Sequence, residues 1–297
     1  MTHAHLIATL PVANILGEGV QWNPRDGAFW WTDIQSRRLY RHHLASGETR
    51  VFETPERLCA FAFIEGRDGM MAAFETGFAL YDPETGALDW RHRPESGDTG
   101  RRFNDGRTDR QGRFWVGTLV EDAAKAGGGS TAALYRLNGD GSLQRMVEDV
   151  AISNGLCWSP DSSLLYFADS PTQKIRVFDF DAGTGSLANP RLFAEMAPNN
   201  YPDGAIIDAQ GHMWTAQWGG HRVLRYRPDG TLASELTLPV EQPTCVAFGG
   251  PDMDILCVTS ARDGLSEAAL AAQPEAGHSF LFKMDVQGLA DMPYRMY

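Results

Sequence analysis

Three oxygen-bearing side chains, each followed by glycine, are the first candidates for chemistry in this 297-residue chain. They are Glu18 of "LGEGVQW", Asn154 of "ISNGLCW" and Asp203 of "YPDGAII". Each precedes an apolar segment of the same kind by ten to twelve residues. Carboxylate and amide oxygens are the ligands that hard divalent cations prefer. If the fold brings the three side chains together, they predict a metal site.

The segments that would position them recur along the chain. The apolar strands of this repeat are "FWWTD" (29–33), "MMAAF" (70–74), "FWVGT" (114–118), "LYFAD" (165–169), "MWTAQ" (213–217) and "LCVTS" (256–260). Each is followed by a second strand and a glycine-containing turn, as in "ETGA" and "PDGT", because glycine accepts positive φ without steric cost. Six units of about 50 residues, each of four strands, indicate one repeat architecture. We predict an all-β fold, a six-bladed β-propeller of four-stranded antiparallel blades around a central channel, in a single domain spanning residues 1–297.

In such a ring the first strand of each blade lies nearest the axis, and its start borders one mouth of the channel. Glu18, Asn154 and Asp203 then occupy equivalent positions in three blades, and closure of the ring brings them towards one point. The glycines that follow them would let the backbone crowd the channel and take strained dihedral angles. Two acids in a narrow channel repel each other unless a cation or protons intervene.

The stretch "YPDGAIIDAQGHMW" contains two turn signals, residues 202–204 and 208–211. Any one of the Glu-Gly, Asn-Gly and Asp-Gly pairs, taken alone, is also typical of a simple turn. The repeat assigns residues 208–211 to the first hairpin of the fifth blade. That leaves Asp203 at the start of the innermost strand, as a carboxylate facing the channel.

Two segments interrupt the repeat: "EDAAKAGGGST" (121–131) in the third blade, and "RDGLSEAALAAQPEAGH" (262–278), with a helix-like "SEAALAAQ", in the sixth. Blade insertions are often found on the functional face, although surface drift also explains either one.

Composition narrows the classes of function. The formal net charge is −12 without a basic stripe, which favours solubility and argues against a nucleic-acid partner.

The first residues do not form a secretory signal, and no apolar stretch is long enough to cross a membrane. Four cysteines without a C-x-x-C pair are expected to be buried thiols, and His221 a surface histidine. We expect a cytoplasmic monomer without a nucleic-acid or membrane partner, and we find no nucleophile elbow, H-E-x-x-H or nucleotide-binding loop.

The motifs taken in order resemble those of the senescence-marker-protein/gluconolactonase/regucalcin-like family, which includes bacterial sugar lactonases such as xylonolactonase. They are "LGEGVQW", "RFNDGRTD", "GTLVE", "ISNGLCWSPD", "YPDGAIIDAQGHMW" and "CVAFGGPDMDILCVTSARDG". The resemblance covers about residues 12–285, and one departure is Val20, where the family often has proline. It implies a six-bladed propeller and an axial metal held by Glu18, Asn154 and Asp203. It also implies substrate contacts from Arg102 and Asn104 of "RFND" and from Glu121 of "GTLVE".

The implied reaction is the hydrolysis of a sugar lactone, such as xylono-, arabinono-, galactono- or gluconolactone, to its aldonic acid. One divalent metal ion would polarise the lactone carbonyl. Oxygen ligands suit calcium, magnesium or manganese, and zinc or ferrous iron stay open. Asp203 would be both a ligand and the general base. Two alternatives remain: a calcium-binding regulatory or interaction propeller without turnover, and a phosphotriesterase-like hydrolase on the same scaffold.

Overall fold

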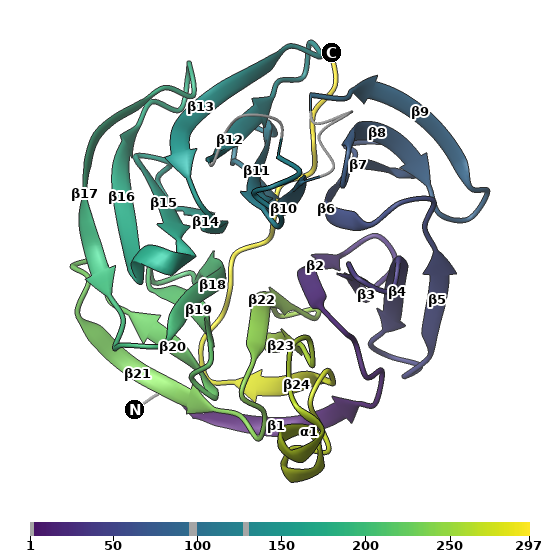
Figure 1. Ribbon diagram of the computed structural model, residues 1–297, viewed down its shortest axis with the longest axis vertical. Helices are drawn as coiled ribbons and strands as arrows, with labels where there is room; N and C mark the ends of the chain where they lie inside the picture. The colour runs from purple at the N-terminus through teal and green to yellow at the C-terminus, as the bar shows by residue number, and fades with distance from the viewer. Residues whose placement is uncertain (1–2, 95–99, 127–130) are drawn as a thin grey trace.

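The computed structural model describes residues 3–94, 100–126 and 131–297. Within these residues, 24 strands form six separate four-stranded antiparallel sheets, arranged as blades in a ring (Figure 1). The predicted six-bladed β-propeller is therefore confirmed. Part of the predicted third-blade insertion, residues 127–130, lies outside the described residues.

The strands are grouped by their place in the blade. The innermost strands are β2 (Gly17–Asn23), β6 (Leu58–Phe63), β10 (Arg101–Thr108), β14 (Ser153–Trp158), β18 (Tyr201–Ile207) and β22 (Pro243–Gly249). The second strands are β3 (Ala28–Asp33), β7 (Met70–Phe74), β11 (Phe114–Val120), β15 (Leu164–Asp169), β19 (Met213–Trp218) and β23 (Ile255–Ser260). The third strands are β4 (Arg38–His43), β8 (Gly77–Asp82), β12 (Ala132–Leu137), β16 (Lys174–Phe180), β20 (Arg222–Tyr226) and β24 (Ser279–Met284). The outermost strands are β5 (Thr49–Glu53), β9 (Ala87–His92), β13 (Leu143–Val150), β17 (Leu187–Glu195), β21 (Leu232–Thr237) and β1 (Ala4–Leu10).

The sixth blade is built from both ends of the chain. Its first three strands are β22, β23 and β24, and its outermost strand is β1, which runs antiparallel to β24 with Leu10 opposite Ser279. The repeat in the sequence did not predict this strand. Two segments far apart in the sequence are thus joined by backbone hydrogen bonds, and this pairing closes the ring.

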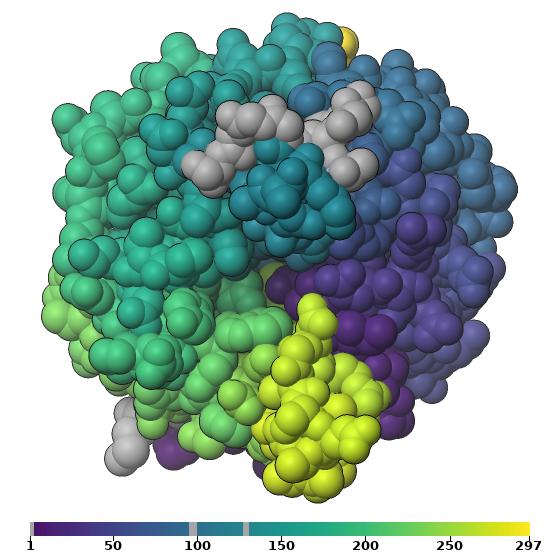
Figure 2. Space-filling model, viewed as in Figure 1, coloured from purple at the N-terminus to yellow at the C-terminus, as the bar shows by residue number. Residues whose placement is uncertain are grey.

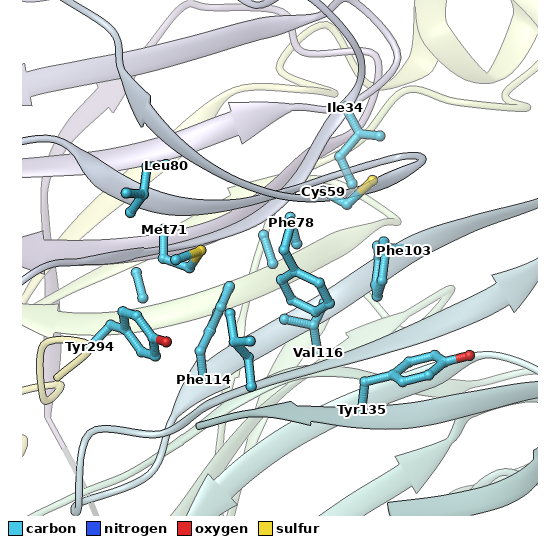
Figure 3. Packing of buried hydrophobic residues seen from close by; sticks show 14 of the residues in the cluster. Ile34, Cys59, Met71, Phe78, Leu80, Phe103, Phe114, Val116, Tyr135 and Tyr294 are labelled. Carbon is cyan, nitrogen blue, oxygen red and sulfur yellow. The ribbon is translucent and has the colours of Figure 1, made fainter. Parts of the chain in front are cut away.

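Burial follows the place of each strand in its blade. Every residue of β14 is buried, whereas β9 alternates between exposed and half-buried residues. The second strands are buried on both faces, so a strand such as β7 (MMAAF) reads as a continuous apolar run rather than as an alternating pattern. Figure 3 shows one of these contacts, in which Phe78 of β8 packs against Phe103 of β10 with ring centroids 4.8 Å apart.

Helical structure is confined to two short pieces among the described residues. Helix α1 (Glu267–Ala272) lies in the 262–278 insertion, as the helix-like pattern predicted, and Ser266 caps it by accepting a hydrogen bond from the Ala269 amide. A single 3-10 turn, η1 (Ser170–Thr172), follows β15. None of the described helices has the length and apolar character needed to span a membrane.

The chain after β24 crosses the ring. This segment, residues 285–297, is called the C-terminal strap below and is yellow in Figure 1. The amide of Gly288 donates to the Met253 carbonyl of the sixth blade at 2.7 Å. Further along, Asp291 forms an ion pair of 2.6 Å with Arg107 of β10, in the third blade. The strap therefore covers the end of β10 opposite to the end that begins at Arg101.

Candidate functional site

Irregular pairing at the inner strands aims the candidate ligands into the channel. The ladder between β2 and β3 is regular up to Glu18 and shifts before Gln21, and the ladder between β14 and β15 shifts directly after Asn154. In β18 the shift encloses Asp203 itself. A β-bulge bends its strand and redirects side chains, which accounts for polar groups pointing to the axis from otherwise apolar strands.

The three positions are similar but not equivalent, which corrects the prediction from the repeat. Gly19 and Gly155 have φ of 60° and 67°, the left-handed region that favours glycine. Gly204 is not in that region. A Cβ added there would lie 2.6 Å from the Cys245 sulfur, so this glycine is needed for close approach between blades five and six. Residues 202–204, which carry a turn signal in the sequence, lie near the start of the innermost strand β18, as the repeat predicts.

A cavity of about 440 Å³ at this end of the channel is lined by five of the six predicted site residues. These are Glu18, Arg102, Asn104, Asn154 and Asp203. Figure 2 views the face that carries the 262–278 insertion, and a hollow lies near its centre. Sequence reasoning missed four polar or aromatic residues of the same lining, namely Ser170, Tyr201, Trp218 and Asp263. Tyr201 and Trp218 face each other across β18 and β19, a pairing that only the strand register reveals.

Burial dominates the electrostatics of the cavity. It raises the pKa of Glu18 from 4.5 to about 8, and the nearby carboxylate of Asp105 adds to this rise. The pKa of Asp203 is raised well above its usual value by burial, and then by the charges of Glu18 and Asp105. Arg102 opposes both shifts only weakly. The channel therefore holds carboxyl groups that lack a sufficient positive partner in the protein.

The amide of Asn154 is oriented by hydrogen bonds on both sides. Its Nδ2 donates to Ser170 Oγ at 2.8 Å, and its Oδ1 accepts from Asn104 Nδ2 at 3.1 Å. Ser170 Oγ in turn donates to the carbonyl of Pro202 at 2.7 Å, next to Asp203. Ser170 thereby links two of the candidate ligands from adjacent blades.

Glu121 lies outside the lining of the cavity, behind Arg102. The Arg102 guanidinium donates from Nε to Glu121 Oε1 at 2.7 Å, and from Nη1 to Asn104 Oδ1 at 2.8 Å. The structure therefore places Arg102 and Asn104 at the cavity and joins Glu121 to them through an ion pair.

The donor set fits an oxygen-preferring divalent cation. No group of three or more His, Cys, Asp or Glu side chains suited to a metal is found in the described part of the chain. The predicted set contains two carboxylates and one amide oxygen, and a cation between them would supply the positive charge that buried Glu18 and Asp203 lack.

The remaining sequence expectations concern residues outside the cavity. All four cysteines are buried free thiols, as predicted. His221 is exposed and does not line the cavity.

Comparison with known proteins relates this chain to one family of sugar lactonases and regucalcins. The model of the SMP-30/Gluconolactonase/LRE-like region matches residues 16–262. The chain is 40% identical over 281 residues to an L-arabinolactonase from Azospirillum brasilense, covering 93% of this chain and 91% of that protein. It is 36% identical over 280 residues to a 6-deoxy-6-sulfogluconolactonase from Pseudomonas putida, covering 94% of each.

A solved structure is similar over nearly the whole length. It is that of a calcium-binding protein, regucalcin, from Agrobacterium tumefaciens, with a TM-score of 0.91, 34% identity and coverage of 98% of both chains.

Proposed function

The chain belongs to the SMP-30/gluconolactonase/LRE-like family, and we propose that it is a metal-dependent sugar lactonase that hydrolyses an aldonolactone to the aldonic acid. The observation that carries this proposal is the cavity, in which two carboxylates, an amide, an arginine and a second amide meet at the mouth of the channel. A volume of about 440 Å³ suits one sugar ring with its hydroxyl groups.

Glu18, Asn154 and Asp203 would hold one divalent ion. When bound, the ion supplies Lewis-acid chemistry that polarises a carbonyl and lowers the pKa of a water molecule. The side-chain amide of Asn154 is kept oriented by two hydrogen bonds, one that it accepts from Asn104 and one that it donates to Ser170. Among calcium, magnesium, manganese, zinc and ferrous iron, calcium is the first to test, because the similar solved structure is described as a calcium-binding protein.

Asp203 is proposed as the residue that accepts the proton of the attacking water. Its carboxylate has two oxygens, so one can serve the metal while the other directs water. Arg102 and Asn104 would hydrogen-bond the lactone carbonyl or ring hydroxyls. The aromatic side chains of Tyr201 and Trp218 supply an apolar wall against which a sugar ring can pack.

The substrate is proposed to be a pentono- or hexonolactone. The relatives named after L-arabinolactone and a sulfogluconolactone support this class. Their names differ in the sugar, and we therefore propose arabinono-, xylono-, galactono- and gluconolactone together as the test set.

A second candidate is a calcium-binding propeller without turnover, favoured by the description of the similar solved structure. It predicts cation binding at the same cavity and no lactone hydrolysis. We further propose that the chain is one domain, since β1 shares a blade with β22, β23 and β24, and that it is a monomer. The four free thiols fit a reducing compartment such as the cytoplasm.

The test is a pH-indicator hydrolysis assay over these lactones, with each metal added to protein stripped by a chelator. We expect Asp203→Ala to lose at least about 100-fold in kcat/KM, because a ligand and a base are removed together. Its circular dichroism should be that of the parent. Asp229→Ala, at an exposed turn, is the matched control and should retain activity. Full activity of Asp203→Ala, or of verified metal-free protein, would contradict the proposed mechanism.

A further inference from the structure

Arg57 lies directly before β6 in the second blade and does not line the cavity. Its Nη1 and Nη2 lie 3.0 and 2.9 Å from the two carboxylate oxygens of Glu121, at the start of the third-blade insertion. Its Nε donates to Glu75 Oε2 at 2.5 Å. The guanidinium therefore clamps Glu121 with two parallel contacts and is itself anchored by Glu75 within its own blade.

Glu121 is held between two arginines. One of its oxygens, Oε1, also accepts from Arg102 Nε at 2.7 Å, and its backbone amide donates to the Gly100 carbonyl at 2.9 Å. Burial alone would raise the pKa of Glu121, but Arg102 and Arg57 outweigh it and lower that pKa. Glu121 is thus a charged bridge between the two guanidinium groups.

The bridge ends on a cavity residue. Arg102 is 5% exposed, and its Nε and Nη1 are taken by Glu121, Asn104 and the Phe103 carbonyl. Its remaining nitrogen, Nη2, has no hydrogen-bond partner in the described part of the chain, and Arg102 lines the cavity. Because the guanidinium is planar, fixing Nε and Nη1 also fixes the direction of Nη2.

An ordinary interblade salt bridge is the competing interpretation, and exposed pairs of that kind contribute little. Arg57 and Glu121 are only 20% and 29% exposed, and the Arg57 contacts are bidentate. More importantly, the chain of contacts continues to Arg102 instead of ending in solvent.

We propose that Arg57 is a positioning residue for the cavity: acting through Glu121, it fixes the Arg102 guanidinium so that Nη2 is presented to the lactone. This inference rests on the proposed lactonase function. It adds a residue from the second blade to a site otherwise built by blades one, three, four, five and six.

The experiment measures kcat and KM separately for Arg57→Gln, Arg57→Lys, Glu121→Gln and the double variant Arg57→Gln/Glu121→Gln. We expect Arg57→Gln to raise KM about tenfold with a smaller change in kcat, since substrate binding is affected before chemistry. Lysine should rescue only in part, because it keeps the charge but not the bidentate contact. The KM of the double variant should be no higher than that of Glu121→Gln alone, because both substitutions break the same chain of contacts.

Arg25→Gln is the matched control, since Arg25 pairs with Asp68 at the surface between blades one and two. It should leave KM unchanged. Calcium affinity, measured by titration calorimetry, should be the same in all these variants and the parent.

An unchanged KM in Arg57→Gln, or additive effects in the double variant, would overturn the proposal. A crystal structure of Arg57→Gln decides it independently of turnover: the Arg102–Glu121 contact should be lost or displaced, and its retention would also overturn the proposal. If the parent hydrolyses no lactone, the proposed function fails, while this structural result still tells whether Arg57 positions Arg102.

Discussion

Glu18 and Asp203 stand out at the scale of single residues because both carboxyl groups are buried in the same channel, where burial raises both pKa values and the charge of Glu18 raises that of Asp203 further. Asp105 lies close enough to add to both shifts, and it is buried as well. Its carboxylate accepts a hydrogen bond from the Leu156 amide at 3.2 Å, which ties β10 to β14. The protein thus keeps more negative groups in the channel than its own arginines neutralise, and protons or a cation must make up the difference.

This arrangement predicts a pH dependence of metal binding. In the metal-free folded protein the Glu18 pKa is raised from 4.5 to about 8, so between these values the folded state holds a proton that the unfolded chain releases. The contribution of Glu18 to the free energy of unfolding is therefore fully present below pH 4.5 and is lost as the pH rises through about 8. A cation must displace the proton, and its apparent affinity should rise by up to about tenfold per pH unit below pH 8.

Thermal melts from pH 6 to 9, with and without calcium, would check this expectation. The stabilisation by calcium should grow with pH, and calorimetry in buffers of different ionisation enthalpy should show proton release. Glu18→Gln should lose both the binding and this dependence. Calcium affinity that stays constant from pH 6 to 8 would count against a site at these carboxylates.

At the scale of elements, two hairpins share one internal arrangement. The stretches "DRQGRFW" and "DAQGHMW" join the first two strands of blades three and five. In each, the aspartate accepts from two backbone amides of the turn and from the indole of the tryptophan that follows: Asp109 from Trp115 at 2.9 Å, and Asp208 from Trp214 at 3.0 Å. One buried carboxylate therefore fixes the turn and the adjacent strand together.

Asp208→Ala should destabilise the fold by about 3–5 kcal/mol, because it removes the carboxylate that forms a 2.6 Å ion pair with the buried Arg225. The indole of Trp214 would also lose its acceptor. Urea unfolding followed by tryptophan fluorescence measures the change. Asp229→Ala removes only an exposed turn acceptor for Thr231 and should cost well below half of that value. Equal losses in the two variants would contradict this role of Asp208.

Local patterns account for what the sequence predicted at this scale. The second strand of every blade, the 208–211 turn and helix α1 all follow from periodicity and turn chemistry over a few residues. Residues 202–204 carry a turn signal, but the repeat predicts them at the start of an innermost strand, and they lie in β18. Ser170, Arg57 and the bridging position of Glu121 were missed because contacts between blades leave no mark in the local sequence.

The C-terminal strap is a feature of the whole molecule. It links blades two, three, five and six, since Tyr294 donates to the Phe63 carbonyl and Ala209 donates to the Gln287 carbonyl. Its Tyr294 also belongs to the apolar cluster in Figure 3. The strap packs against one mouth of the channel, and the residues proposed to bind metal and substrate lie at the other.

Asp291→Asn should lower the free energy of unfolding by about 3 kcal/mol, because Arg107 is 5% exposed and would lose the carboxylate with which it forms its 2.6 Å ion pair. The calcium affinity should stay unchanged, since the pair lies at the far end of β10. Denaturant unfolding and calorimetry measure the two quantities. Asp285→Asn, an exposed position of the same strap, is the control and should match the parent. A large loss of calcium affinity in Asp291→Asn would show that the two mouths are coupled.

The pairing of β1 with β24 also has a consequence for biosynthesis. Strand β1 leaves the ribosome before every other strand of the ring, and its partner β24 is the last to be made. During translation the first strand must stay unpaired while five blades form in order, with two of its apolar residues, Leu6 and Ile7, exposed even in the finished fold. The nascent chain thus carries an open strand edge, the kind of surface that chaperones shield, until the sixth blade is complete.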